Sequence, residues 1–497
     1  MPFQTTSHFF CLVCMTSLLF VTACEDVTTG IHSDVIDAIE SDSFDAGSLD
    51  DPGTSPADTT TELPDTNPIP DDVVEDGTDT SQPLPSEPSP SLYTADRIHS
   101  PITPFVAQNL HEIAELGPEM QDNVFMKVGA SSTVSSRNLK CLAGNTADLG
   151  NHTDLQETLD YFMTGDAAGT TPYERTTIAA KVGHSAGWVI SGAPSPLQQE
   201  VQAIAPRMGL VHYGTNDMGL GTTHESAMWN FGTNMLDLMD ELIAQGIIPI
   251  LIGISPRGDS VTADRWVHTY NAIIRGLAQA RQVPFIDLQF ATAELSGFGL
   301  AGDGVHLNTF KEDGSYQACV FTDEGLAYGF NMRNLISLQA LDRVRNALVN
   351  PETIPDDDVF LTGDGSPEAP FLIPHLPFSH RGNTALSPHS NLNVYGGCDA
   401  DQDESGPELM YRLDLEETTR LRAMVFDRGD VDVDLHLLDN SPTEGSCIER
   451  AHQIISGTFE AGTYLLSLDT FVSGGTPRAG EYVLVVNVCH PEDPTCD

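Results

Sequence analysis

The sequence of 497 residues predicts an α/β protein, with a three-layer α/β/α, doubly wound parallel sheet followed by a C-terminal antiparallel β-sandwich. Two observations lead to this fold class. Apolar strand-like segments alternate with helical segments across residues 93–350, a pattern typical of a parallel sheet covered by helices. After residue 393 the apolar residues recur with a period of two, a pattern typical of strands with one buried face.

Strands and helices of residues 93–350 can be placed one by one. We expect strands at 124–128, 208–213, 247–254 and 283–288, and helices at 196–205, 224–245, 262–282 and 322–349. The segment 247–254 is continuously apolar, as in a parallel strand that is buried on both faces. Pro196 near the start of one helix and Gly246 at the end of another agree with the usual positions of these residue types.

The region after residue 393 contains six segments with strand-like alternation. They are 409–415, 420–426, 431–438, 454–459, 463–468 and 482–488. The segments Asp432-Val433-Asp434-Leu435, Ala461-Gly462-Thr463-Tyr464 and Gly480-Glu481-Tyr482 resemble the pre-peptidase C-terminal type of domain of secreted bacterial enzymes. The resemblance covers about residues 366–490 and implies an accessory role, such as contact with polysaccharide or protein. We expect residues 351–392 to be a loop-rich linker and 393–497 to be the sandwich.

The net charge of −50 is unevenly distributed along the chain. Residues 25–92 contain 18 Asp and Glu but no Lys or Arg, and they are rich in Pro, Ser and Thr. Such a segment buries too little apolar surface to offset its ordering entropy, so we expect residues 24–92 to be a disordered, extended tether. The overall charge argues against a nucleic-acid partner, because affinity for the phosphate backbone comes from clustered Lys and Arg.

The first 23 residues have the features of a signal peptide. Residues 9–23 form an apolar run that is too short for a membrane span and ends in Val21-Thr22-Ala23-Cys24. This ending resembles the bacterial lipobox, which implies lipidation of Cys24 and a lipid-anchored position in the bacterial cell envelope, at the outer membrane or the cell surface. Cleavage near Ala23 by an ordinary signal peptidase is the alternative.

Six cysteines remain after the predicted signal peptide and Cys24. An even number of cysteines in an exported protein indicates disulfides. Two lie in residues 93–350 and four in 351–497, so we predict the pairs Cys141–Cys319, Cys398–Cys447 and Cys489–Cys496. These six form no Cys-x-x-Cys pair, which argues against zinc, and we expect no metal and no other cofactor.

Polar side chains follow the ends of the predicted strands, where the sites of α/β sheets gather. Ser131 follows the first strand, Asn216 follows 208–213, and Asp303 and His306 lie in the loop before the last helix. A serine nucleophile needs a base that takes its proton, and that base needs a carboxylate that holds its tautomer. His306 and Asp303 are suited to these two tasks, and the Asn216 amide can donate to a developing oxyanion.

The order and context of these residues resemble the SGNH (GDSL) hydrolase family over about residues 120–350. The matching motifs are Gly129-Ala130-Ser131, residues 183–187, Gly214-Thr215-Asn216-Asp217 and Asp303-Gly304-Val305-His306. The resemblance implies a flavodoxin-like three-layer fold and ester hydrolysis through an acyl-serine intermediate. It makes Ser131 the nucleophile, His306 the general base and later acid, and Asp303 the group that orients His306.

The resemblance also implies an oxyanion hole and shows one departure. The hole would comprise the N–H of Ser131, Asn216 and the N–H of Gly187, with Gly183 as the alternative glycine. Ala130 stands where the family has Asp. The loss of that carboxylate would leave the turn that contains Ser131 less well ordered, but it would not remove Ser131, His306 or Asp303.

Several other polar residues have less specific interpretations. We expect Asp217 to be a turn residue, His212 to be a satisfied core histidine, and Arg257 to face solvent, with substrate contact as its alternative. His184 and Trp188 lie on a predicted loop that could line the pocket. In the sandwich, Asp430, Asp432 and Asp434, and also Asp399, Asp401 and Asp403, permit calcium, but solvated acidic faces are the favoured interpretation.

Two function classes follow from the sequence. The first is a monomeric, surface-anchored serine esterase that acts on a small-molecule or carbohydrate ester, with acetylated carbohydrate suggested by the family alone. The second is a non-catalytic surface lipoprotein that keeps the fold for binding.

Overall fold

The computed structural model describes residues 89–144, 146–349, 356–357 and 359–496. The predicted signal peptide, Cys24 and most of the predicted tether lie outside these residues. Residues 89–92 belong to the tether by sequence, but Ser91 and Leu92 are buried in the structure. Within the described part of the chain, no helix combines the length and the apolar character that a membrane span requires.

A parallel sheet of four strands forms the centre of the α/β region, the part of the chain up to residue 349. Its order is β1-β2-β3-β4, with β1 Gln121–Gly129, β2 Pro206–His212, β3 Ile248–Ile252 and β4 Phe285–Ile286. All pairs in this sheet are parallel. Every residue of β2, β3 and β4 is buried, as expected for strands with helices on both faces.

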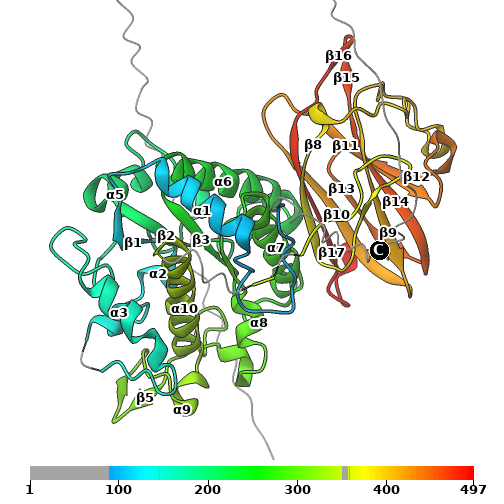
Figure 1. The fold of residues 1–497 in the computed structure, drawn as a ribbon. Coiled ribbons are helices and arrows are strands. Elements are labelled where there is room, and N and C mark those ends of the chain that lie inside the picture. The colour runs from blue at the N-terminus through cyan, green and yellow to red at the C-terminus, as the bar shows by residue number, and fades with distance from the viewer. Residues whose placement is uncertain (1–88, 145, 350–355, 358, 497) are drawn as a thin grey trace, which may run out of the picture. The chain divides into compact units, whose positions relative to one another are not determined.

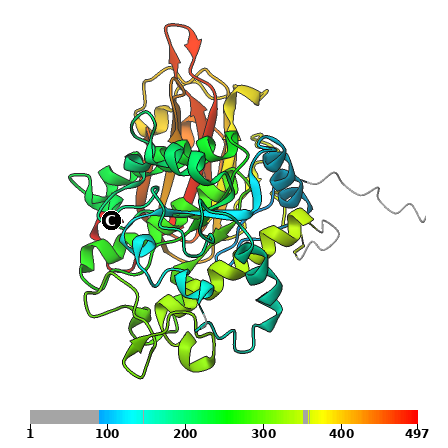
Figure 2. The ribbon, with the colours of Figure 1, turned by 90° about the vertical axis from the view of Figure 1, so that its left-hand side faces the viewer.

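Helices cover both faces of this sheet (Figures 1 and 2). On one face lie α6 (His224–Ala244) and α7 (Val261–Ala280), which contact each other and β3. On the other face α1 (Pro104–Glu115) packs against α10 (Gly329–Val349). The remaining helices are α2 (Ser131–Val134), α3 (Gln156–Met163), α4 (Ala186–Val189), α5 (Pro196–Ile204), α8 (Leu288–Thr292) and α9 (Asp323–Leu326).

Local sequence fixes where two of these helices begin. The Ser195 side chain accepts the N–H of Gln198, whose own side chain accepts the N–H of Ser195, so that a capping box precedes Pro196 of α5. Thr223 and Ser226 form the same reciprocal pair at the start of α6. These bonds satisfy N–H groups that the first helical turn leaves without partners.

The doubly wound topology is present in a reduced form. Along the edge of β1 that faces away from β2, the described residues form one isolated parallel bridge, between Gly129 and Ala180. A complete doubly wound sheet would have a further strand at this edge. The chain leaves β1 toward this bridge and then returns to β2 on the other side of β1. The winding direction therefore changes at the carboxyl end of β1, the place where open α/β sheets bind ligands.

The C-terminal region forms two sheets, β13-β10-β17-β8 and β12-β11-β14-β9-β7. The strands are β7 Phe371–Leu372, β8 Phe378–Asn383, β9 Leu409–Leu415, β10 Thr419–Asp427, β11 Val433–Asp439, β12 Cys447–Ala451, β13 Ile454–Phe459, β14 Gly462–Thr470 and β17 Glu481–Val488. A small hairpin, β15 (Val472–Ser473) and β16 (Thr476–Pro477), completes the region. Buried side chains of both sheets form one core, so we refer to this region as the sandwich.

Two expectations about this region are wrong. Strands β7 and β8 lie inside residues 351–392, which the sequence assigned to a loop-rich linker. They were not expected, because β7 has two residues and β8 has one apolar residue followed by polar residues and Gly, so neither shows a strand-like alternation. The sheets are also not wholly antiparallel, since β7 pairs with β9 in parallel.

The sandwich packs directly on α6 and α7. Phe426 and Val485 of the sandwich belong to the same buried cluster as the core of the α/β region. Two helical glycines allow this contact: a Cβ on Gly232 would lie 2.6 Å from two ring carbons of Phe426, and one on Gly276 would lie 2.9 Å from Val485 Cγ2. The structure contains the disulfides Cys141–Cys319, Cys398–Cys447 and Cys489–Cys496, with the predicted pairing.

Candidate active site

Ser131 lies at the carboxyl end of the central sheet, as the first residue of α2, directly after β1. The segment between α8 and α9 brings His306 to it, although 175 positions separate the two residues in the sequence. His306 Nε2 lies 2.8 Å from Ser131 Oγ. This is hydrogen-bond distance, so the imidazole can accept the hydroxyl proton of Ser131.

Asp303 holds the other side of the same imidazole. Its Oδ2 lies 2.8 Å from His306 Nδ1, and its Oδ1 accepts the N–H groups of Val305 and His306 at 3.0 Å each. These bonds, led by the one from the His306 N–H, lower the pKa of Asp303 to about 2. The carboxylate therefore stays ionised at neutral pH and fixes the tautomer in which Nε2 is the acceptor.

Asn216 and Asp217 follow β2 and connect two loops of the site. Asn216 Nδ2 donates to the His184 carbonyl at 3.0 Å, which leaves the second amide hydrogen for another acceptor. The buried Asp217 accepts the N–H of Ala186 at 2.8 Å and the N–H of Gly214 at 3.0 Å. Burial raises the pKa of Asp217 to about 6, while these two N–H bonds act in the opposite direction. Asp217 therefore does more than form a turn, because it joins the loop after β2 to α4.

The two candidate glycines for an oxyanion hole differ in position. Gly187 lies in the first turn of α4, where N–H groups have no acceptor within the helix, and a Cβ there would lie 2.9 Å from Asn234 Nδ2. Gly183 lies in the preceding turn with a φ of +74°, and a Cβ at this position would have no neighbour within 4 Å. Neither glycine lines the pocket beside Ser131, so both stay candidates for the third donor.

The pocket beside Ser131 is small. Its volume is about 10 Å³, close to the minimum that a single water molecule requires. Its lining includes Ala130, Ser131, His212, Tyr213, Thr215, Asn216 and Val305. Tyr213 and Val305 were not predicted as lining residues, because their types carry no catalytic signal and only their adjacency to Asn216 and His306 marks them.

The structure corrects the expectations for His212 and Arg257. His212 is buried, as expected, but its Nε2 has no hydrogen-bond partner among the described residues, and it lies in the pocket wall. Burial, with a contribution from Arg333, lowers its pKa well below the usual value, so the ring is neutral. The Arg257 side chain is only 15% exposed: it pairs with Asp259 and donates to the Thr215 carbonyl at 3.1 Å.

His184, in the loop before α4, contacts Trp188, with ring centroids 4.8 Å apart; Trp188 lies within α4 and not on the predicted loop. The His184 side chain is half-buried and its Nδ1 lies 2.9 Å from the Val182 carbonyl oxygen. His184 reaches the candidate site through its carbonyl, which Asn216 contacts, and neither side chain lines the pocket at Ser131.

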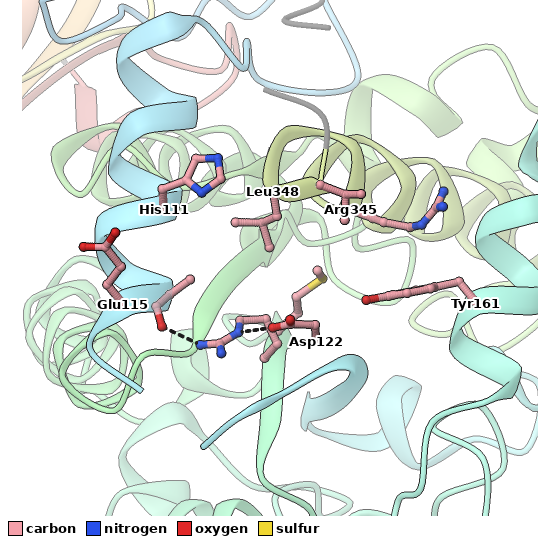
Figure 3. A pocket seen from close by; sticks show the side chains of 10 residues that line it. His111, Glu115, Asp122, Tyr161, Arg345 and Leu348 are labelled. Atoms are coloured by element: carbon pink, nitrogen blue, oxygen red, sulfur yellow. Dashed lines mark hydrogen bonds and ion pairs between the residues drawn. The ribbon is translucent and has the colours of Figure 1, made fainter. Parts of the chain in front are cut away.

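A second pocket lies at the opposite, amino-terminal end of the strands (Figure 3). It is lined by His111 and Glu115 of α1, Asp122 of β1, Tyr161 and Arg345, among others. Arg207 in its wall donates to Asp122 Oδ1 at 2.7 Å and to the carbonyls of Ala114, Met120 and Gly246. Because this guanidinium is committed to protein acceptors, we assign the pocket no catalytic role.

The solvated acidic faces that the sequence favoured are present at Asp399, Asp401, Asp403 and Asp430, but Asp434 departs from this expectation. Ligand atoms of Asp432, Asp434 and His452 lie within 4.8 Å of one another, but Asp434 is buried and pairs with both Arg450 and His452. Asp399, Asp401 and Asp403 are exposed. Since Asp434 already has basic partners, we assign no cation to this group.

Comparisons with known proteins relate the central part of the chain to one family. Residues 165–309 match the family model of the GDSL-like Lipase/Acylhydrolase family. The central region resembles a GDSL-like hydrolase. The matched residues include Asn216, Asp303 and His306 but begin after Ser131. A search of curated proteins gives no match.

Solved structures with related chains share little sequence with this one. A GDSL-like lipase from Bacteroides thetaiotaomicron is 16% identical, with 48% of this chain and 98% of that chain covered and a TM-score of 0.27. An acetylxylan esterase from Geobacillus stearothermophilus is 14% identical, with 44% and 93% covered and a TM-score of 0.28. A two-domain esterase active on acetylated mannans is 12% identical, with 80% and 97% covered and a TM-score of 0.26.

Proposed function

We propose that this protein is a serine esterase that removes short acyl groups, with acetyl as the simplest, from hydroxyl groups of carbohydrate. The observation that carries the proposal is the continuous contact from Ser131 Oγ to His306 and from His306 to Asp303, at 2.8 Å each.

In the acylation step, His306 Nε2 takes the proton of Ser131 as its Oγ attacks the ester carbonyl carbon. The oxyanion that forms is stabilised by the N–H of Ser131, the free amide hydrogen of Asn216 and the N–H of Gly187 or Gly183. When the intermediate collapses, the bond from carbon to the alcohol oxygen breaks, and protonated His306 gives its proton to the leaving alcohol. In the second step, His306 activates a water that releases the acid and restores Ser131.

The presence of Ala130, where the family has Asp, leaves all the groups that act in these steps in place. Its carbonyl accepts the N–H groups of Thr133 and Val134 at 3.0 Å, so the backbone of the nucleophile turn is held without the Asp that the family has. The intact contacts of Ser131, His306 and Asp303 favour the enzyme over a lipoprotein that only binds.

The decisive test replaces Ser131. We expect Ser131→Ala to reduce hydrolysis of p-nitrophenyl acetate by roughly 10⁴-fold or more and to abolish labelling by a fluorophosphonate probe. Ser135→Ala, a change of a nearby serine whose Oγ accepts the N–H of Arg137, is the matched control and should keep both. Equal turnover in the wild type and Ser131→Ala would exclude Ser131 as the nucleophile.

We further propose that Cys24 carries a lipid that holds the enzyme at the cell envelope, with the acidic segment of residues 25–88 as a tether. The ending Val21-Thr22-Ala23-Cys24 and the 18 uncompensated acidic residues that follow support this. Mass spectrometry of the mature N-terminus tests it: an unmodified Cys24 would exclude the anchor.

A further inference from the structure

A cavity of about 460 Å³ lies where α7 and α8 of the α/β region meet the carboxyl end of β17. Its volume is within the range of about 300–1,000 Å³ that is typical of small-molecule sites. Asp264 and His268 of α7 and Phe290 of α8 contribute to one side. Asn487 and His490 of the sandwich contribute to the other.

This cavity and the candidate active site share two loops. Pro256 lines the cavity, and the next residue, Arg257, donates to the carbonyl of Thr215 in the pocket beside Ser131. Phe298 also lines the cavity, and the adjacent Gly299 carbonyl accepts the N–H of Asn308, two residues after His306. A molecule that occupies the cavity therefore lies next to the segments that position the reacting groups.

Two phenyl rings in the cavity wall are unusually accessible. Phe290 is 46% exposed and Phe298 is 50% exposed. Phe298 adopts a φ of +57°, a left-handed conformation that is rare and costly for a bulky residue. An exposed ring held in this way is unfavourable in water alone but can pack against an apolar face of a ligand.

The polar groups of the wall suit an uncharged ligand. Arg275 is paired with Asp287, so its charge is already balanced within the protein, and Asp264 Oδ1 accepts the backbone N–H of Arg257. His268, Gln289 and His490 offer both donors and acceptors. Burial, assisted by His490, lowers the pKa of His268, so its ring is neutral at pH 7. Hydroxyl groups, which both donate and accept, are the chemistry that matches such a wall.

We propose that this cavity binds sugar units of a neutral oligosaccharide and thereby holds the alcohol part of the ester while its acyl group reaches Ser131. The sugar C–H faces pack on Phe290 and Phe298, and the sugar hydroxyls bond to the polar wall. The sandwich is then a part of the substrate site through Asn487 and His490. This inference rests on the proposed esterase function for its kinetics but not for its binding measurement.

Binding is measured by calorimetry with the full chain carrying Ser131→Ala, and with mannopentaose, xylopentaose and cellopentaose as separate probes. We expect one of them to bind and the double change Phe290→Ala, Phe298→Ala to weaken it at least tenfold. His490→Ala should weaken it by a smaller factor. Phe360→Ala, which removes a ring that is 42% exposed outside the cavity, is the matched control and should leave the dissociation constant unchanged.

Kinetics on the acetylated form of the bound sugar give a second readout. The phenylalanine changes in the otherwise native protein should raise KM at least tenfold, with a smaller effect on kcat, because they remove ground-state binding. Absence of binding for all three sugars, or equal affinity of the double variant and its control, would overturn the inference. If Ser131→Ala retained full esterase activity, the proposed function would fail, whereas the calorimetric result would stand independently.

Discussion

Arg422 of β10 lies over the indole ring of Trp266 in α7, with its Cζ 3.9 Å from the ring centroid. The same guanidinium donates to Asp493 Oδ2 at 2.8 Å and to Thr269 Oγ1 at 3.1 Å. The Arg422 side chain has no exposed surface, and Asp493 is 1% exposed. The ion pair lies within the sandwich, and the same cation joins the sandwich to α7 through its bond to Thr269 and its contact with the Trp266 ring.

Removal of Arg422 should destabilise both regions together. Arg422→Ala leaves Asp493 buried without its cation, and we expect the free energy of unfolding in urea to fall by about 3–5 kcal/mol. Arg412→Ala is the control, since Arg412 pairs with Asp414 at the surface and its loss should cost about 1 kcal/mol or less. Equal effects of the two changes would show that the buried pair has no structural role.

Gly232 should be required for the contact between α6 and the sandwich. In an isolated helix Ala is more stable than Gly by about 1 kcal/mol, so a helical Gly→Ala change normally stabilises. Here the new Cβ would lie 2.6 Å from two Phe426 ring carbons, and we expect Gly232→Ala to lower the unfolding free energy by about 1–3 kcal/mol. Gly445→Ala, with no neighbour within 4 Å, is the control. A stabilised Gly232→Ala protein would contradict this packing.

Loss of the Asp303 carboxylate should lower the rate of ester hydrolysis by a similar factor at every pH between 5 and 9. The pKa of Asp303 is lowered from 3.8 to about 2. Its negative charge therefore stabilises the folded protein above the ordinary carboxyl pKa, and this stabilisation is lost only as the pH falls through about 2. Between pH 5 and 9 it does not titrate. Asp303→Asn should therefore reduce kcat/KM by at least about a hundredfold, by a similar factor at each pH. Asp313→Asn, in an exposed turn, should have no effect. A loss confined to one part of that pH range would argue against this role.

Glu404 should make the stability of the protein depend on pH. Its side chain is fully buried, and burial together with neighbouring Asp434 raises its pKa well above the usual value. The folded protein then keeps a proton that the unfolded chain loses above about pH 4.5, so stability falls as the pH rises. Relative to Glu404→Gln, the unfolding free energy of the wild type should fall between pH 5 and 8 by up to about 1.4 kcal/mol per pH unit.

The comparison for Glu404 uses urea unfolding at several pH values. Glu417→Gln, at an exposed position, should follow the wild type at every pH. If Glu404→Gln also followed the wild type, Glu404 would be ionised in the folded protein.

Most of the central elements could be predicted from sequence because their signals are local. The apolar run at 247–254 contains β3, and the capping residues Ser195 and Thr223 lie immediately before α5 and α6. The isolated bridge beside β1 and the two-residue strand β7 could not be predicted, because pairing over one or two residues leaves no periodic pattern in the sequence.

Motif order and spacing along the chain identify the residues that are available for the chemistry: Ser131 after a strand, Asn216 after another, and Asp303 three positions before His306. That information is present in the sequence without any coordinates. Three other relationships emerge only from the folded chain: Arg257 supports Thr215, His212 lines the pocket, and His490 of the sandwich lines a cavity beside the same loops. These are contacts between distant segments, which depend on how the layers pack, and a single sequence contains no local signal for them.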